Sequence, residues 1–276
     1  MARSRASGAW GRILPAVVLG LLSLGPPAFA APQPFRIVSA EEAPTNYTRD
    51  GRFTGITTDI VEAMLAEAGL EAVIEVYPWA RAYDIALKEP NVLIFTAGRT
   101  QERVDLGFGF IGPVTTRKHT LYKKAGSPLA ITSLEDLRRQ GLLVGAMRGD
   151  WREKHLRDKG VAVKDVTSHG QSLKMLQEGR IDLVALSDLE LAENLLISGV
   201  DRRALEPAFV FQELDAYILV SKGSSPESYA KLRAAFAALR DRGFLETTAG
   251  KWSGLLGLPL GYDAAKGIHY LPEPAR

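Results

Sequence analysis

Two arginines follow a short apolar segment in a pattern that could bind a carboxylate. Residues 92–95 are apolar and come directly after Pro90 and Asn91, which predicts a buried strand. Arg99 and Arg103 come just after that segment, so they are expected at the carboxyl end of the strand. Ligands bind at this end in open α/β sheets, and a planar guanidinium can hold a carboxylate through two parallel hydrogen bonds. The alternative is that both arginines are solvated on a surface loop.

The elements that would position these arginines alternate between strand and helix patterns. Strands are expected at residues 35–38, 71–77, 92–95, 142–146, 161–166, 181–186 and 216–221, and helices at 55–69, 79–88, 150–159, 168–178 and 226–240. Another helix should begin at Ser133, because Asp136 completes a capping box. This βαβ rhythm predicts an α/β fold with mostly parallel sheets. Residues 258–276 are rich in Pro and Gly and are expected to form a tail, packed on the surface or frayed.

The first thirty residues are expected to be a signal peptide. Three arginines lie within the first twelve residues, residues 13–24 are apolar, and a small-x-small cleavage pattern ends at Ala30. The apolar run is shorter than the roughly twenty residues that span a bilayer. Cleavage after Ala30 would release a soluble, exported chain, so we expect a periplasmic location.

Composition and motifs exclude several classes of function. Without the three arginines of the first thirty residues, the 34 basic and 32 acidic residues become 31 and 32. With no basic tail or patch, nucleic acid is a poor partner candidate. The four histidines have no metal-ligand spacing, and the GxGxxG pattern of residues 107–112 is followed by Pro113 rather than a helix. No metal, no cofactor and no catalytic constellation is therefore predicted.

Several motifs occur in the order found in one known family. They are the loop at 41–47, G-x-x-x-G-x-x-x-D-I at 51–60, T-x-x-R within 96–103, the lobe start at 133–137 and 144–149, G-R-x-D at 179–182 with a later acid, and a closing helix at 243–252. Over residues 35–252 the chain resembles bacterial extracellular solute-binding proteins of family 3, which bind amino acids for ABC importers. The departures are Gly98, where the family usually has a small polar residue, Arg99, where it has an aliphatic one, and one extra residue before Asp188.

The resemblance implies a two-lobed periplasmic binding protein fold (type II). Each lobe is then a mostly parallel sheet flanked by helices, and two hinge crossovers are expected near residues 116–124 and 213–218. The first lobe would comprise residues 31–118 and 216–276, including the C-terminal tail, and the second lobe residues 119–215. The implied partners are a small-molecule ligand and the membrane permease of an ABC importer, and the protein is expected to be a monomer.

The resemblance also implies a ligand site. Arg103 would hold the α-carboxylate of the ligand, helped by the N–H groups at the start of the helix after residue 149. An ammonium group would meet Asp188 if that side chain faces the cleft; the alternative is that Asp188 caps a helix at 189–198. Two aromatic rings could enclose the rest of the ligand. The full set of expected ligand-binding residues is Arg103, Tyr47, Trp79, Thr96, Gly98, Arg99, Gly149, Asp150, Trp151 and Asp188.

Two other functions were weighed against solute binding. A lyase or dehydratase could use the same scaffold, since fold does not determine function. It would need a general acid or base in the cleft, and the candidates are Glu102, Asp150, Asp188 and His169, none of them paired at a telling spacing. A soluble ligand sensor for a signalling system is the other possibility. The function predicted is binding, without catalysis.

Overall fold

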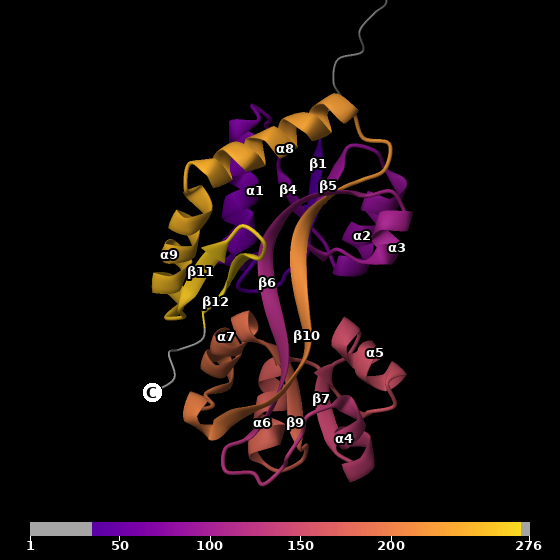
Figure 1. The fold of residues 1–276 in the computed structure, drawn as a ribbon, viewed down its shortest axis with the longest axis vertical. Coiled ribbons are helices and arrows are strands. Elements are labelled where there is room, and N and C mark those ends of the chain that lie inside the picture. Colours follow the sequence, from indigo (N-terminus) through magenta and orange to yellow (C-terminus); the bar gives the residue numbers. More distant parts are fainter. Residues whose placement is uncertain (1–34, 272–276) are drawn as a thin grey trace, which may run out of the picture. The chain divides into compact units, whose positions relative to one another are not determined.

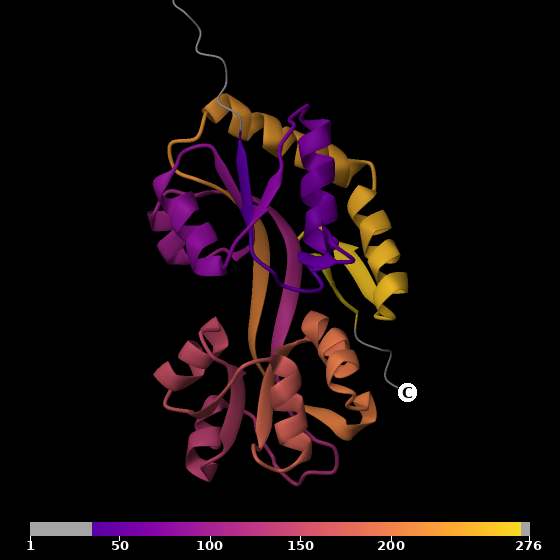
Figure 2. The same ribbon diagram turned by 180° about the vertical axis from the view of Figure 1, so that it is seen from behind.

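The computed structural model describes residues 35–271, and the predicted signal peptide with its cleavage site lies outside them. One sheet runs through the described chain in the strand order β4-β1-β5-β10-β6-β9-β7-β8, with β11 and β12 beside it (Figures 1 and 2). Its outer strands pair in parallel on both sides, whereas β10 is antiparallel to β5 and β6, and β6 is antiparallel to β9. Within residues 35–271, no helix is long and apolar enough to span a membrane.

The first lobe is built from both ends of the described chain. Its elements are β1 (Arg36–Ser39), β2 (Tyr47–Arg49), β3 (Arg52–Thr54), α1 (Ile56–Glu67), β4 (Ile74–Val76), α2 (Trp79–Lys88), β5 (Val92–Gly98), α3 (Gln101–Asp105), α8 (Pro226–Asp241), α9 (Phe244–Leu256), β11 (Leu260–Asp263) and β12 (Gly267–Tyr270). Alternate residues of the strands face opposite sides. Ile37 and Leu93 pack with α1, α8 and α9, whereas Val38 and Ile94 pack with α2.

The second lobe repeats this sandwich with a different set of helices. Its elements are α4 (Leu134–Gln140), β7 (Leu143–Met147), α5 (Trp151–Asp158), β8 (Ala162–Val166), α6 (His169–Gln177), β9 (Leu183–Ser187), α7 (Asp188–Ser198) and a short 3-10 helix (Arg202–Ala204). Leu183 packs with α4 and α5 on one side of the sheet, and Val184 packs with α6 and α7 on the other. Ser133 caps α4 with the capping box predicted from the sequence.

Two long strands connect the lobes. β6 (Gly109–Lys124) and β10 (Leu205–Val220) pair from one end to the other, and the central pair is visible in Figure 1. β10 also pairs with β5 of the first lobe, and β6 with β9 of the second. The two crossovers are thus continuous strands. The predicted lobe boundaries, at residues 118/119 and 215/216, fall inside these strands.

The C-terminal segment corrects the sequence-based expectation. Residues 258–276 were expected to be a surface or frayed tail, but β11 and β12 form a hairpin whose Ile268 is fully buried and pairs with Thr115 of β6. Gly267 makes this approach possible: its φ is +70°, and a Cβ there would lie 2.4 Å from the Val114 carbonyl oxygen. Glycine suggested a loose tail in the sequence, but Gly267 in fact allows close packing against the hinge strand β6.

Candidate ligand-binding site

Arg103 lies on α3, directly after the carboxyl end of β5, as its position in the sequence predicts. Thr100 caps this short helix by accepting a hydrogen bond from the Arg103 backbone N–H. The guanidinium donates from Nη1 to the Gly98 carbonyl at 2.6 Å and lies 5.6 Å from the Trp79 ring and 5.1 Å from the Tyr83 ring. These contacts within residues 35–271 include no carboxylate. Most of the N–H donors of the guanidinium are therefore available to an anion.

Two aromatic rings of α2 support Arg103. Trp79 stacks on Tyr83 with a centroid distance of 5.8 Å and an interplanar angle of 13°, so the pair presents π faces to the cation. Tyr47, the other expected ring, packs against Trp252 at 6.4 Å instead. Tyr47 and Trp79 therefore belong to different hydrophobic clusters of the first lobe.

The remaining residues of the T-x-x-R segment have separate environments. Thr96 is buried with φ at +62°, and its hydroxyl donates to Asn46 Oδ1. Gly98 has room for a side chain, since a Cβ would be 3.8 Å from Arg103 Nη1. Arg99 is exposed, with its guanidinium 5.4 Å from the Phe110 ring. The structure thus brings Gly98 and Arg103 into contact, while Arg99 lies over a different ring.

Two N–H groups of the helix start expected to hold a carboxylate already have protein partners. Gly149 donates its N–H to Glu153 Oε2 at 3.1 Å, and the Asp150 N–H donates to the Met147 carbonyl at 3.1 Å. Asp150 is the N-cap of α5. Trp151 is 39% exposed, and its ring lies perpendicular to the His119 ring at 4.7 Å. A ligand at this position would replace existing hydrogen bonds.

Asp188 is the first residue of α7, and the N-cap is Ser187, so the alternative in which Asp188 caps this helix is wrong by one residue. Ser187 and Glu190 form a capping box, the pattern that identifies a cap in sequence. Asp188 Oδ1 accepts from the backbone N–H of Lys118 at 3.1 Å and from its own neighbour Leu189 at 2.9 Å. Burial raises the pKa of Asp188 to about 6, although these two hydrogen bonds oppose the rise.

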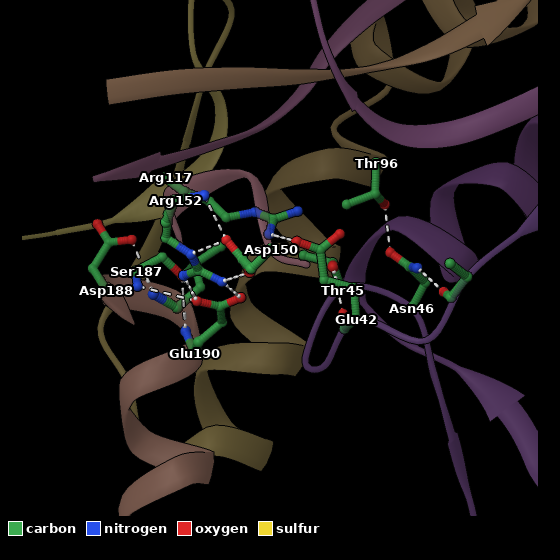
Figure 3. Close-up of polar contacts among 12 residues, drawn as sticks. Glu42, Thr45, Asn46, Thr96, Arg117, Asp150, Arg152, Ser187, Asp188 and Glu190 are labelled. Carbon is green, nitrogen blue, oxygen red and sulfur yellow. Dashed lines mark hydrogen bonds and ion pairs between the residues drawn. The ribbon is translucent and has the colours of Figure 1, made fainter. Parts of the chain in front are cut away.

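A buried ion cluster in the second lobe was not predicted from the sequence (Figure 3). Arg152 is 3% exposed; it donates to Glu190 Oε2 at 2.5 Å and to Asp150 Oδ2 at 2.6 Å. Burial alone would raise the pKa of Glu190, but Arg152 together with the other positive charges beside it outweighs burial and holds this pKa well below its ordinary value. Arg152 Nη2 also lies 3.2 Å from His169 Nε2. Because arginine only donates, that nitrogen must accept, and His169 carries its proton on Nδ1.

A second ion pair joins a hinge strand to the first lobe. Arg117 of β6 is 5% exposed and donates from Nη1 to Glu42 Oε1. Glu42 lies in the turn after β1, where its backbone carbonyl accepts from the N–H groups of Thr45 and Asn46. Glu42 lies in the loop at 41–47, which resembles the family's first ligand loop, but neither Glu42 nor Arg117 was named as a ligand-binding residue.

The chain matches one protein family over most of its length. The family described as "Bacterial extracellular solute-binding proteins, family 3" matches residues 36–255. No curated protein matches the sequence. Among residues 35–271, no three His, Cys, Asp or Glu side chains are grouped so that they could hold a metal ion.

Solved structures with low sequence identity share the fold. A histidine kinase sensor domain with similarity to periplasmic binding proteins has a TM-score of 0.68 at 18% identity, covering 81% of this chain and 97% of its own. An ancestral arginine-binding protein bound to arginine has 0.64 at 22%, covering 79% and 97%. The arginine-, lysine-, histidine-binding protein ArtJ of Geobacillus stearothermophilus has 0.63 at 18%, covering 80% and 96%. At such identities the likeness shows the fold alone.

Proposed function

Because the chain belongs to family 3 of the bacterial extracellular solute-binding proteins, we propose that it captures a small carboxylate-bearing solute and delivers it to an ABC importer. The solute is an amino acid or a derivative of one. The proposal includes export to the periplasm after cleavage at Ala30 and a monomeric protein that docks on a membrane permease. Family membership assigns the chain to binding proteins rather than to enzymes. The alternative function, a lyase or dehydratase, is therefore not supported.

The observation that carries the proposal is the environment of Arg103. Arg103 is half-buried as a residue, and its guanidinium rests on two stacked rings and contacts one carbonyl, with no carboxylate among its contacts within residues 35–271. A partly desolvated guanidinium is usually paired with an anion. A carboxylate from solution supplies that partner.

The continuous hinge strands support capture by closure. β6 and β10 carry the main-chain connections between the lobes, so a change of backbone angles in two adjacent strands can move one lobe toward the other. Hinge closure of this kind is the motion for which periplasmic binding proteins serve as the general example. A solute that contacts both lobes stabilises the closed form by its extra contacts there.

A sensor role is the second candidate, because one solved structure with the same fold is a histidine kinase sensor domain. Both roles begin with capture of the solute, and they differ in the partner of the closed form. Uptake of the bound solute into vesicles that contain the cognate permease distinguishes transport from sensing.

Thermal unfolding tests capture directly. Each L-amino acid is compared with its α-carboxamide, which lacks only the carboxylate. A ligand at a hundred times its Kd stabilises a protein by about 2.7 kcal/mol, which for this size raises the melting temperature by about 5–10 °C. We expect that rise for at least one acid and not for its amide. Small-angle scattering should show a smaller radius of gyration, and a stabilised protein that does not contract would contradict closure.

A further inference from the structure

The part of β6 and β10 that can bend is short. β10 pairs with β5 only from Ala216 onward, and β6 pairs with β9 only from His119 onward. Residues 116–118 of β6 and 213–215 of β10 therefore pair with each other and with no third strand of the described chain. Because each strand has a single hydrogen-bonded neighbour there, its backbone angles are less restrained than elsewhere in the sheet. We call these six residues the hinge segment.

Tertiary contacts restrain the β6 side of the hinge segment. Arg117 pairs with Glu42 in the turn after β1. The Lys118 N–H donates to Asp188 at the start of α7. The remaining residue, Thr116, contacts the hairpin of β11 and β12. Three elements that are far apart in the sequence thus meet at three consecutive residues.

The turn of the hairpin reaches both strands of the hinge segment. The oxygen of the buried Thr116 hydroxyl is 2.5 Å from the Lys266 carbonyl oxygen and 2.7 Å from Asp215 Oδ1, and its one proton can be donated to either acceptor. Lys266 Nζ lies 3.2 Å from Glu213 Oε1 of β10. Residues directly opposite each other in an antiparallel pair share a face of the sheet, and Thr116 and Asp215 are such a pair. The contacts of Lys266 are therefore made from one side of the strands.

The hairpin is anchored at one end of the hinge segment and makes contact at the other. Ile268 is fully buried and pairs with Thr115, the first-lobe residue just before the hinge segment. Glu213 is opposite Lys118, at the end of the hinge segment next to the second lobe. The pair of Lys266 and Glu213 thus spans the hinge segment, and bending of the strands changes the distance between the two charges.

The hairpin and Arg103 are on opposite faces of the first-lobe sheet. Ile268 belongs to the buried cluster of α1, α8 and α9, whereas the rings that support Arg103 belong to the cluster of α2. Figures 1 and 2 both show the hairpin and α2 on different sides of the β6–β10 pair. Closure on a carboxylate held by Arg103 moves the second lobe toward the α2 face. The same rotation opens the other side of the hinge and separates Glu213 from Lys266.

The hairpin lies beyond the part of the chain that matches the family. The match covers residues 36–255, whereas β11 and β12 lie within residues 260–270. Family membership therefore does not imply a contact between this hairpin and the hinge.

We propose that the turn of the C-terminal hairpin is a clamp that opposes closure of the lobes. Lys266 contacts Thr116 and Glu213 in the hinge segment, and these contacts are released when the lobes close. The clamp reduces the fraction of free protein that is closed, and it lowers the affinity for the solute accordingly. The direction of the effect rests on the proposed function, because Arg103 defines the face toward which the lobes close.

Distances between spin labels on the two lobes test the clamp without any solute. The chain has no cysteine, so Ala80→Cys on α2 and Lys159→Cys after α5 place one nitroxide on each lobe of the full mature chain. Both residues are exposed. Pulsed electron spin resonance gives the distribution of distances. Thr116→Val together with Lys266→Met removes the clamp, and we expect the ratio of molecules at shorter distances to those at longer distances to rise about threefold or more.

A matched control makes the same two changes away from the hinge. In Thr247→Val with Lys251→Met, the lost contacts are those of the Thr247 hydroxyl with the Gly243 carbonyl and of Lys251 with Asp59. Both contacts lie within the first lobe, so the distance distribution should not change. Melting curves of all variants check that each is folded at the temperature of the measurement.

Glu213→Gln removes the ion pair from the β10 side. It should shift the distribution in the same direction as Lys266→Met, and the two changes together should shift it little further, because both remove one contact. Full additivity of the two shifts would show that Lys266 and Glu213 do not act as a pair, and it would overturn the clamp.

Two further results would also decide against the proposal. A distribution that Thr116→Val with Lys266→Met changes no more than the control overturns the clamp. A shift toward longer distances overturns the proposed direction of the effect. Neither result bears on capture of a carboxylate, which the comparison of each amino acid with its α-carboxamide tests separately.

Discussion

Two arginines occupy comparable positions in the two lobes and have opposite surroundings. Arg103 follows β5 in the first lobe and rests on aromatic rings with no carboxylate contact, whereas Arg152 follows β7 in the second lobe and pairs with two buried carboxylates. Both come after the carboxyl end of a parallel strand, where ligands usually bind. The charge partners, rather than the position in the fold, distinguish the arginine that we propose binds a carboxylate from the one that is paired within the protein.

The pairing of Arg152 has a consequence for the second lobe. Its cation already has two anionic partners, and the Gly149 and Asp150 N–H groups also have partners. Arg152 and these two N–H groups therefore have little positive charge to offer to a carboxylate. The comparison predicts that substitutions in the second lobe change mainly stability, and that substitutions of Arg103 change mainly binding.

The largest expected effect is on stability, from Arg152→Met. The substitution keeps much of the aliphatic stem and leaves Asp150 and Glu190 buried without their counter-charge. Breaking a buried ion pair from one side costs about 3–5 kcal/mol, which lowers the melting temperature of a protein of this size by about 6–20 °C. Differential scanning calorimetry measures the shift.

Arg240→Met is the control for that prediction. Arg240 pairs with its neighbour Asp241 at the exposed end of α8, and surface pairs contribute about 0–1 kcal/mol. A loss of stability in Arg152→Met no larger than in this control would mean that the buried cluster is not structural, and the contrast between the two arginines would fail.

Arg103→Ala is expected to have the next largest effect, and on binding alone. Removing one partner of a buried ion pair in a complex costs about 2–5 kcal/mol, so the affinity for a carboxylate solute should fall about thirtyfold or more. Arg103→Lys should also weaken binding, because an ammonium cannot form two parallel hydrogen bonds. Titration calorimetry measures both affinities. Undiminished binding by Arg103→Ala would show that the solute carboxylate binds elsewhere.

The sequence predicted the position of Arg103 after β5, because the strand and the loop that follows it are local. The strand, the short loop and the Arg103 side chain lie within about a dozen consecutive residues, and Gly98, the acceptor of its hydrogen bond, is five residues away. Trp79 was identified from the same resemblance. The α/β alternation also follows from patterns of short range, since each helix and strand has its own periodicity. The two-lobed fold was implied by the family resemblance.

The ion cluster could not be predicted because its members come from separate parts of the chain. Arg152 follows β7, Glu190 follows β9, and Glu42 is in the turn after β1. Each has an ordinary local explanation: Glu190, for example, completes a capping box. Only the tertiary fold brings the carboxylates to the two arginines. The C-terminal hairpin was missed for a similar reason, because the need for Gly267 arises from the neighbouring strand.

The smallest expected effect concerns Asp188 and depends on pH. Burial raises the pKa of Asp188 from 3.8 to about 6, so between these values the folded protein holds a proton that the unfolded chain has released. The contribution of Asp188 to the free energy of unfolding is therefore present at low pH and lost as the pH rises toward 6. At 1.36 kcal/mol per pKa unit the loss is at most ~3 kcal/mol.

Asp188→Asn removes this titration without removing the acceptor of the Lys118 and Leu189 hydrogen bonds. The free energy of unfolding of the wild-type protein minus that of the variant, measured by urea titration, should therefore fall between pH 4 and pH 6 and be constant above. Other carboxylates such as Glu75, whose pKa is lowered to about 2 by Arg36, affect both proteins equally and cancel in the difference. A difference that rises with pH would mean that Asp188 is stabilised as an anion in the free protein.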